Sequence, residues 1–79
     1  MAEFVPAVGN ILSLIERGDW DKLEQNLAPD IHWITAVEEH LHGPADVIAQ
    51  VRLDGVPGPP AFHEVDAQGR LTYWVDKMG

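Results

Sequence analysis

The chain is 79 residues long, 46% of its residues are hydrophobic, and 13 acidic against 5 basic side chains give a formal net charge of −8. This length allows a single domain, residues 1–79, with a small core. Domains of this size usually need further stabilisation, and no cysteine is present to form a disulfide or a thiolate zinc site. We therefore expect the chain to pair with a second copy. The excess of acid argues against nucleic acid and membrane surfaces as partners, since phosphate groups are bound mainly through Lys and Arg.

The first predicted element is a helix over residues 2–17. The leading stretch MAEFVPAVGN lacks the basic start and the unbroken apolar run of a signal peptide, so we expect a cytoplasmic protein. No apolar stretch approaches the ~20 residues that a membrane helix needs. The apolar side chains that recur at helical spacing are Phe4, Val5, Val8, Ile11, Leu12 and Ile15.

The tripeptide Arg17-Gly18-Asp19 is interpreted as the corner between two helices and not as an adhesion signal. Gly18 follows the last apolar-periodic residue, where a left-handed cap is common. Asp19 is a favourable N-cap for a second helix. That helix presents Trp20, Leu23 and Leu27 on one face, and Pro29 closes it.

A strand is predicted over residues 31–37, because "IHWITAV" is rich in β-branched and aromatic residues. Its two faces both carry bulky apolar groups, so we expect the strand to be covered on both sides. Alternation places Ile31, Trp33, Thr35 and Val37 on one face and His32, Ile34 and Ala36 on the other.

The next stretch, residues 38–42, is predicted as a polar connection or a short strand continuation. A third helix begins at Gly43 and Pro44, because proline is favoured at the first helical position, and it ends at Gly55. Its inner face consists of Val47, Ile48 and Val51.

The remaining residues predict a β-hairpin after the extended segment "VPGPP" at residues 56–60. The strands are residues 61–65 and 70–75, joined by a four-residue loop in which Gly69 is available for positive φ. Alternation sets Leu71, Tyr73 and Val75 against Thr72, Trp74 and Asp76. The order helix, helix, strand, helix, hairpin predicts an α+β domain, with the helices packed on one face of a curved antiparallel sheet.

Four pieces of the sequence, in order, resemble the SnoaL-like branch of the nuclear transport factor 2-like superfamily: "RGDWDKLEQNLAPD", "IHW", "GPADVIAQV" and "GRLTYWVD". The resemblance implies a cone of helices against a bent antiparallel sheet, enclosing an apolar pocket, usually in homodimers. Members include polyketide cyclases, ketosteroid isomerases, epoxide hydrolases, dehydratases and binding proteins without chemistry. This chain is shorter: only "LDGVPGPPAFHEVDAQ" separates Arg52 from Gly69, so at least one hairpin is missing and apolar sheet surface is left for a partner.

Two residues are candidates for catalysis. Asp76 lies near the end of the last strand, where the resemblance implies that cyclases and isomerases can place a general acid or base; the alternative is a solvated acid near the chain end. His32 lies on the strand that lines the pocket in the family and is a candidate base or donor. The alternative is a hydrogen-bonded histidine beside a core tryptophan.

The second candidate feature is an aromatic wall for an apolar ligand, formed by Trp20, Trp33 and Trp74. The alternative is that these residues fill the core and a dimer interface, where aromatic side chains dominate. For His63 a cross-strand pair with Tyr73 is the plainer role. The candidate ligand-binding residues are Trp20, Trp33, His63, Tyr73 and Trp74.

His40-x-His42, with Glu38 and Glu39 before it, is a weak metal pattern, because no third ligand follows at a diagnostic spacing. We therefore expect a polar loop and no metal. No phosphate loop, dinucleotide glycine pattern or nucleophile elbow is present, so no cofactor is expected either.

Three functions remain open from the sequence. The preferred one is a module that binds a small apolar molecule, serves as a dimerisation module, or both. The second is a cyclase- or isomerase-type enzyme that uses Asp76 or His32 as a proton shuttle. The third is a protein–protein interaction domain that uses the exposed sheet.

Overall fold

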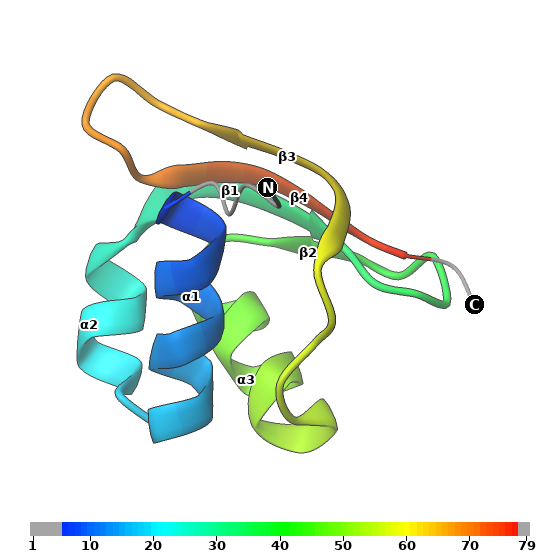
Figure 1. The fold of residues 1–79 in the computed structure, drawn as a ribbon. Coiled ribbons are helices and arrows are strands. Elements are labelled where there is room, and N and C mark those ends of the chain that lie inside the picture. Colours follow the sequence, from blue (N-terminus) through cyan, green and yellow to red (C-terminus); the bar gives the residue numbers. More distant parts are fainter. Residues whose placement is uncertain (1–5, 78–79) are drawn as a thin grey trace, which may run out of the picture.

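Helices and strands are interleaved along residues 6–77, the part of the chain that this computed structural model describes (Figure 1). The predicted α+β class is confirmed. The elements are α1 (Pro6–Arg17), α2 (Trp20–Gln25), β1 (Leu27–Ile34), β2 (His40–His42), α3 (Pro44–Asp54), β3 (Pro60–Val65) and β4 (Leu71–Asp76).

The strands form one four-stranded sheet in the order β2-β1-β4-β3. The pairs β1–β2 and β3–β4 are antiparallel, whereas the central pair β1–β4 is parallel. The prediction of a purely antiparallel sheet is therefore wrong for the central pair. The connection from β1 to β4 contains β2, α3 and β3, and this long crossover returns the chain to run in the same direction as β1.

The three helices of the described residues lie on one side of the sheet, as predicted (Figure 1). Among the described residues, no helix combines the length and the apolar character that crossing a bilayer requires. Burying the apolar stripes of the helices against the inward side chains of β1 and β4 produces the core. Its members are Val8, Ile11, Leu14, Ile15, Leu23, Leu27, Ile31, Trp33, Val47, Val51, Leu71 and Trp74.

Helix α1 buries most of the predicted stripe. Val8, Ile11 and Ile15 are buried and Leu12 is partly buried, whereas Leu14, which was not assigned to the stripe, is 2% exposed. A wide apolar face includes such a position, because residues three and four apart share one side of a helix. The predicted contribution of Phe4 and Val5 lies outside the described residues.

The corner after α1 forms as predicted, but α2 is shorter. Gly18 has φ of 69°, and the Gly18 and Asp19 amides donate to the carbonyls of Ile15 and Leu14, the pattern of a left-handed helix cap. Asp19 precedes α2 without a capping hydrogen bond from its side chain. The helix ends at Gln25 and not at Pro29, because Leu27 already pairs with Leu71 of β4.

The central strand is displaced toward the N-terminus relative to the predicted residues 31–37. Ile31, Trp33 and Thr35 are buried on the helix side. The expected cover on both sides is wrong within the described residues, because the face that carries His32 and Ile34 has no helix over it (Figure 1). Val37 is 75% exposed because the strand ends at Ile34 and a turn follows. In that turn Glu38 has φ of 63°, and its amide donates to the Thr35 carbonyl.

The predicted alternation of the last strand is confirmed from Tyr73 to Asp76 and is wrong for Leu71. Leu71 and Trp74, three residues apart, are both buried, while Tyr73 and Val75 lie on the opposite face. Shifts in the pairing of β4 with both neighbours, between Leu27 and His32 and between Glu64 and Val65, account for the change of side.

Candidate functional site

The sequence-predicted site residues do not form one site, because they lie on opposite faces of the sheet. Trp33 and Trp74 face the helices, where both are buried. His32 and Tyr73 are partners in adjacent strands and lie on the other face. The two candidate catalytic residues, Asp76 and His32, are therefore separated by the sheet and do not act on one substrate together.

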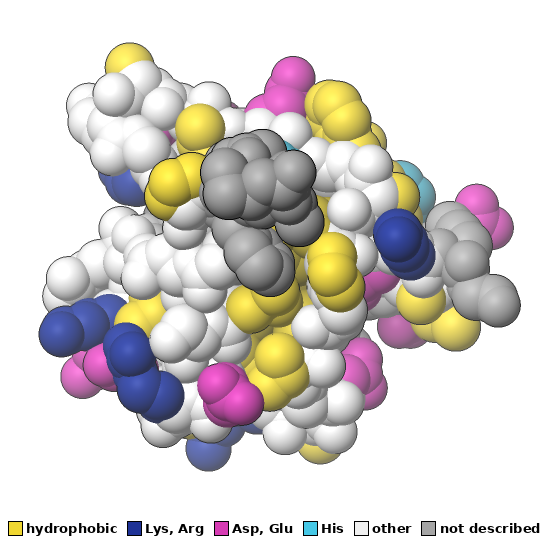
Figure 2. Space-filling view, viewed as in Figure 1, with side chains coloured by type: hydrophobic (Ala, Val, Ile, Leu, Met, Phe, Trp, Pro, Cys, Tyr) yellow, Lys and Arg dark blue, Asp and Glu magenta, His cyan; other side chains and the backbone are white. Residues whose placement is uncertain are grey.

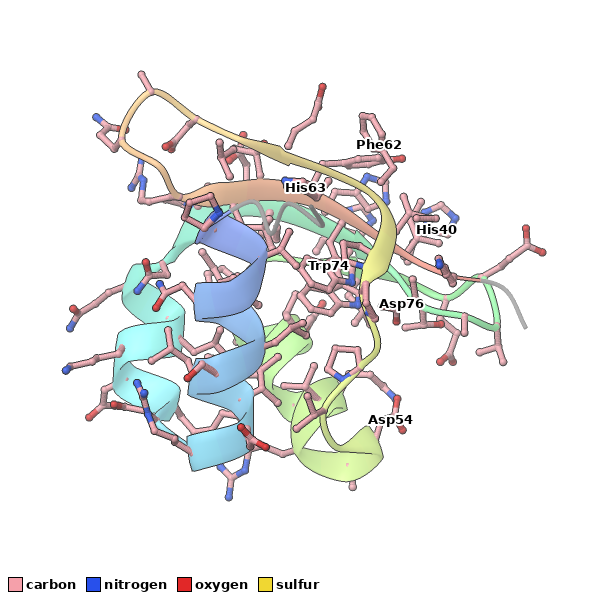
Figure 3. The ribbon with its side chains drawn as sticks, viewed as in Figure 1. His40, Asp54, Phe62, His63, Trp74 and Asp76 are labelled. Atoms are coloured by element: carbon pink, nitrogen blue, oxygen red, sulfur yellow. The ribbon has the colours of Figure 1, made fainter. Side chains whose placement is uncertain are left out.

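On the helix side, Asp76 is held by the two central tryptophans. The indole N–H of Trp74 donates to Oδ1 of Asp76 at 2.6 Å, and that of Trp33 donates to Oδ2 at 3.4 Å. The two indole rings stack with their centroids 4.5 Å apart. Figure 3 shows Trp74 and Asp76 on the side of the sheet that carries the helices. The carboxylate is thus fixed in position by donors from two neighbouring strands.

A pocket lies beside Asp76, with a volume of about 220 Å³. It is smaller than the ~300–1,000 Å³ of typical ligand sites, and the buried tryptophans behind it do not line it. Figure 2 shows hydrophobic side chains gathered between α1 and the segment that leads to β3, which supplies part of the pocket wall. The lining residues are Ala36, Pro57, Gly58, Pro59, Asp76 and Lys77.

The sheet face opposite the helices, called the outer face here, carries two rows of side chains that run across all four strands. Register determines the rows, because directly paired residues project to the same side. One row is His42, His32, Tyr73 and Glu64, and the other is His40, Ile34, Val75 and Phe62.

Three of the four histidines of the chain meet on this face and are called the histidine cluster: His32, His40 and His42. Nε2 of His32 and Nδ1 of His40 are 2.8 Å apart and share a hydrogen bond. The ring of His42 stacks on that of His32 at 4.6 Å, and Tyr73 meets His32 edge-on at 5.2 Å. Burial lowers the pKa of His32, and the positive charges that His42 and His40 acquire on protonation lower it further.

The weak metal pattern of His40-x-His42 becomes part of this cluster. Across residues 6–77 the structure holds no group of three or more His, Asp or Glu side chains arranged to bind a metal ion. The nitrogen of His40 that faces His32 is already engaged in the hydrogen bond between the two rings. Glu39 contributes its backbone amide, which donates to the Thr35 hydroxyl.

Two further candidates lie elsewhere. Trp20 is half-buried at the corner between α1 and α2, with the Arg52 guanidinium 5.7 Å from the centre of its ring. His63 pairs with Trp74 and not with the predicted Tyr73, so it lies on the helix side of β3. His63 is therefore separate from the histidine cluster.

Sequence reasoning missed the assembly of the outer face. Phe62, Glu64, Ile34 and Val75 were not candidates, and His32 was not connected with His40 or His42. Alternation within each strand was the available signal, but it does not show which strands are neighbours or which residues are opposite.

Comparison with protein-family models, with curated proteins and with solved structures finds no match to this chain.

Proposed function

We propose that this chain is a dimerisation module that pairs with a second copy through the outer face of its sheet. The observation that carries the proposal is the pair of side-chain rows, which form a continuous polar and aromatic surface with all three described helices on the opposite side (Figure 1). A sheet face that no helix covers suits a two-fold contact, in which the same patch is used by both subunits.

Charge favours this face over the rest of the surface for contact between two copies. The chain has a net charge of −8 and 13 acidic residues, so two copies repel over most of their surface. Among the eight side chains of the two rows, only Glu64 is acidic. Two copies therefore approach with least repulsion through this face, and interfaces are in general depleted of charged residues at their centre.

The composition of the face supports the same partner. Phe62 is 49% exposed and meets Tyr73 edge-on at 5.6 Å, which leaves aromatic surface in contact with water. Ile34 and Val75 lie beside them, half-buried. A few residues at the centre of a contact, with aromatic side chains prominent among them, supply most of its binding energy.

We also propose that the chain is a shortened member of the SnoaL-like branch that it resembles. It is supported by the order of the elements and by three helices against one sheet, and it implies homodimers. A shortened sheet with an uncovered face is a further reason for a partner, since a small domain has little core of its own. The parallel central pair is the feature that this resemblance does not explain.

Sedimentation equilibrium at pH 7.5 tests the proposal. We expect wild type to be dimeric in the micromolar range, and Phe62→Asp to be monomeric with an unchanged circular dichroism spectrum. Leu53→Asp is the matched control, because Leu53 is 83% exposed on α3 and lies away from the outer face. A wild type that remains monomeric at about 100 μM, or equal effects of the two substitutions, overturns the proposal.

A second candidate function is the binding of a small, largely apolar molecule in the pocket beside Asp76. It is supported by the position of a fixed carboxylate on a wall otherwise rich in proline. Proton-transfer chemistry of the cyclase or isomerase type would use the same carboxylate without His32. The test is a ligand screen by thermal shift: hits must raise the melting temperature of wild type and lose this effect in Asp76→Ala, and a screen without such hits removes the candidate.

A further inference from the structure

We propose that the histidine cluster makes the pairing of two copies pH-sensitive, so that the dimer forms at neutral pH and dissociates in mildly acidic solution. This inference rests on the proposed dimerisation through the outer face and adds its regulation. It follows from where the three imidazoles lie relative to one another and to the other charges on that face.

The contacts within the histidine cluster favour uncharged imidazole rings. The hydrogen bond between Nε2 of His32 and Nδ1 of His40, at 2.8 Å, needs one nitrogen with a proton and one without. When both rings are protonated, two donors and two positive charges face each other over that distance. A charge on His42 adds a third, because its ring is stacked on His32 at 4.6 Å.

The acidic groups near the cluster compensate this charge only in part. On β4 the facing residue is Tyr73, which is not a carboxylate, and Glu64 follows one strand further on β3. With strands about 4.8 Å apart, Glu64 is roughly 10 Å from His32. Asp30, two residues before His32 on β1, and Glu38 and Glu39 in the turn before β2 are exposed to water.

Pairing increases the cost of protonation. An interface removes water from the imidazoles, and a buried cation without a partner is strongly unfavourable. Glu64 of a second copy neutralises one imidazolium at most, whereas the cluster holds three rings. Protonated clusters on two apposed faces therefore repel each other and favour separation.

An opposing effect acts over a longer range. Protonation of all four histidines reduces the net charge of each copy from −8 to −4, which weakens the general repulsion between copies. At physiological ionic strength, charges separated by more than about 8 Å are largely screened. The loss of water around the imidazoles on pairing acts at the interface itself and is not screened in this way, so it determines the sign of the pH dependence.

The experiment is sedimentation equilibrium at pH 7.5 and pH 5.5 in 0.15 M salt. For wild type we expect the dimer dissociation constant to rise about tenfold or more. A tenfold rise corresponds to a pKa that is one unit lower in the dimer than in the monomer for one imidazole. For the triple variant His32→Gln, His40→Gln, His42→Gln we expect a change below about threefold. His63→Gln is the control and keeps the wild-type response, because His63 lies on the helix side.

The outcomes separate the regulation from the dimerisation. A wild type without a dimer at pH 7.5 overturns both. A dimer that is equally stable at pH 5.5, or a triple variant that weakens as wild type does, overturns the regulation and leaves the dimerisation standing. If circular dichroism shows the triple variant unfolded, Glu64→Gln decides: loss of the acid in the row must enlarge the wild-type response to acid, and an unchanged or smaller response overturns the regulation.

Discussion

Trp33 and Trp74 lie opposite each other in the parallel β1–β4 pair, with their rings stacked at 4.5 Å and both indole N–H groups donating to Asp76. They are 1% and 0% exposed. The two tryptophans thus join the two central strands through side chains as well as through the backbone. Of the two readings of the tryptophans that the sequence left open, this position favours the core, and Asp76 is its polar anchor.

Trp74→Ala should destabilise the domain severely. Removing a fully buried tryptophan leaves a cavity, which costs about 3–5 kcal/mol, a large part of the stability of a domain this small. Trp74→Phe retains an aromatic ring and should cost less. Urea unfolding followed by circular dichroism measures the difference. Trp20→Ala is the control, because Trp20 is half-buried; an equal loss there would contradict the central role of the stacked pair.

Asp76→Ala should cost about 1–3 kcal/mol, because the indole donors of two buried tryptophans lose their acceptor. Asp76→Asn should cost less, since its amide oxygen still accepts from Trp74. Lys77→Ala, at the neighbouring exposed position, should change stability by no more than about 0.5 kcal/mol. The measurement is urea unfolding followed by tryptophan fluorescence; similar values for all three variants would argue against the anchor.

The free energy of unfolding should decrease as the pH falls below 6.5, the ordinary pKa of His32. Burial, with the neighbouring His42 and His40, lowers the pKa of this imidazole in the folded state, so the unfolded chain binds the proton first. The loss begins near 6.5 and is complete once the pH is below the pKa of the folded state.

His32→Gln should flatten this pH dependence, whereas His63→Gln should preserve it. The measurement is the urea midpoint between pH 7.5 and 5, at a protein concentration low enough to keep the chain monomeric, which separates folding from pairing. If His32→Gln leaves the pH dependence of the urea midpoint unchanged, a group other than His32 is responsible for it.

Two glycines should respond to alanine in opposite directions. Gly69 closes the β3–β4 loop with φ of 81°, which strains any residue with a Cβ, so Gly69→Ala should cost about 1 kcal/mol. Gly9 lies within α1 and has open space around a Cβ, so Gly9→Ala should gain about 0.5–1 kcal/mol. Thermal unfolding should show melting temperatures shifted in opposite directions; shifts of the same sign would contradict these two assignments.

The sequence by itself determined the local structure wherever a short-range rule decides the conformation. Gly18 ends α1 because glycine adopts positive φ at no steric cost. Pro44 begins α3, because an amide N–H at the first helical position would have no partner in the helix anyway. Gly55, which also has positive φ, ends that helix. Alternation grouped Ile31 with Trp33 on one face of a strand, and both are buried, but it did not show which face would be covered by the helices. These choices depend on residues a few positions apart, so they are readable along the chain.

Only the tertiary structure decided which strands are neighbours. The parallel pairing of β1 with β4 places Trp33 beside Trp74 and Asp76, and the pairing of β1 with β2 places His32 against His40 and His42. Such contacts join residues 8 to 43 positions apart. Register depends on the packing of the whole sheet against the helices, and a shift of one residue would move each side chain to the other face. The sequence pattern of a single strand does not indicate which strand it pairs with or in which register.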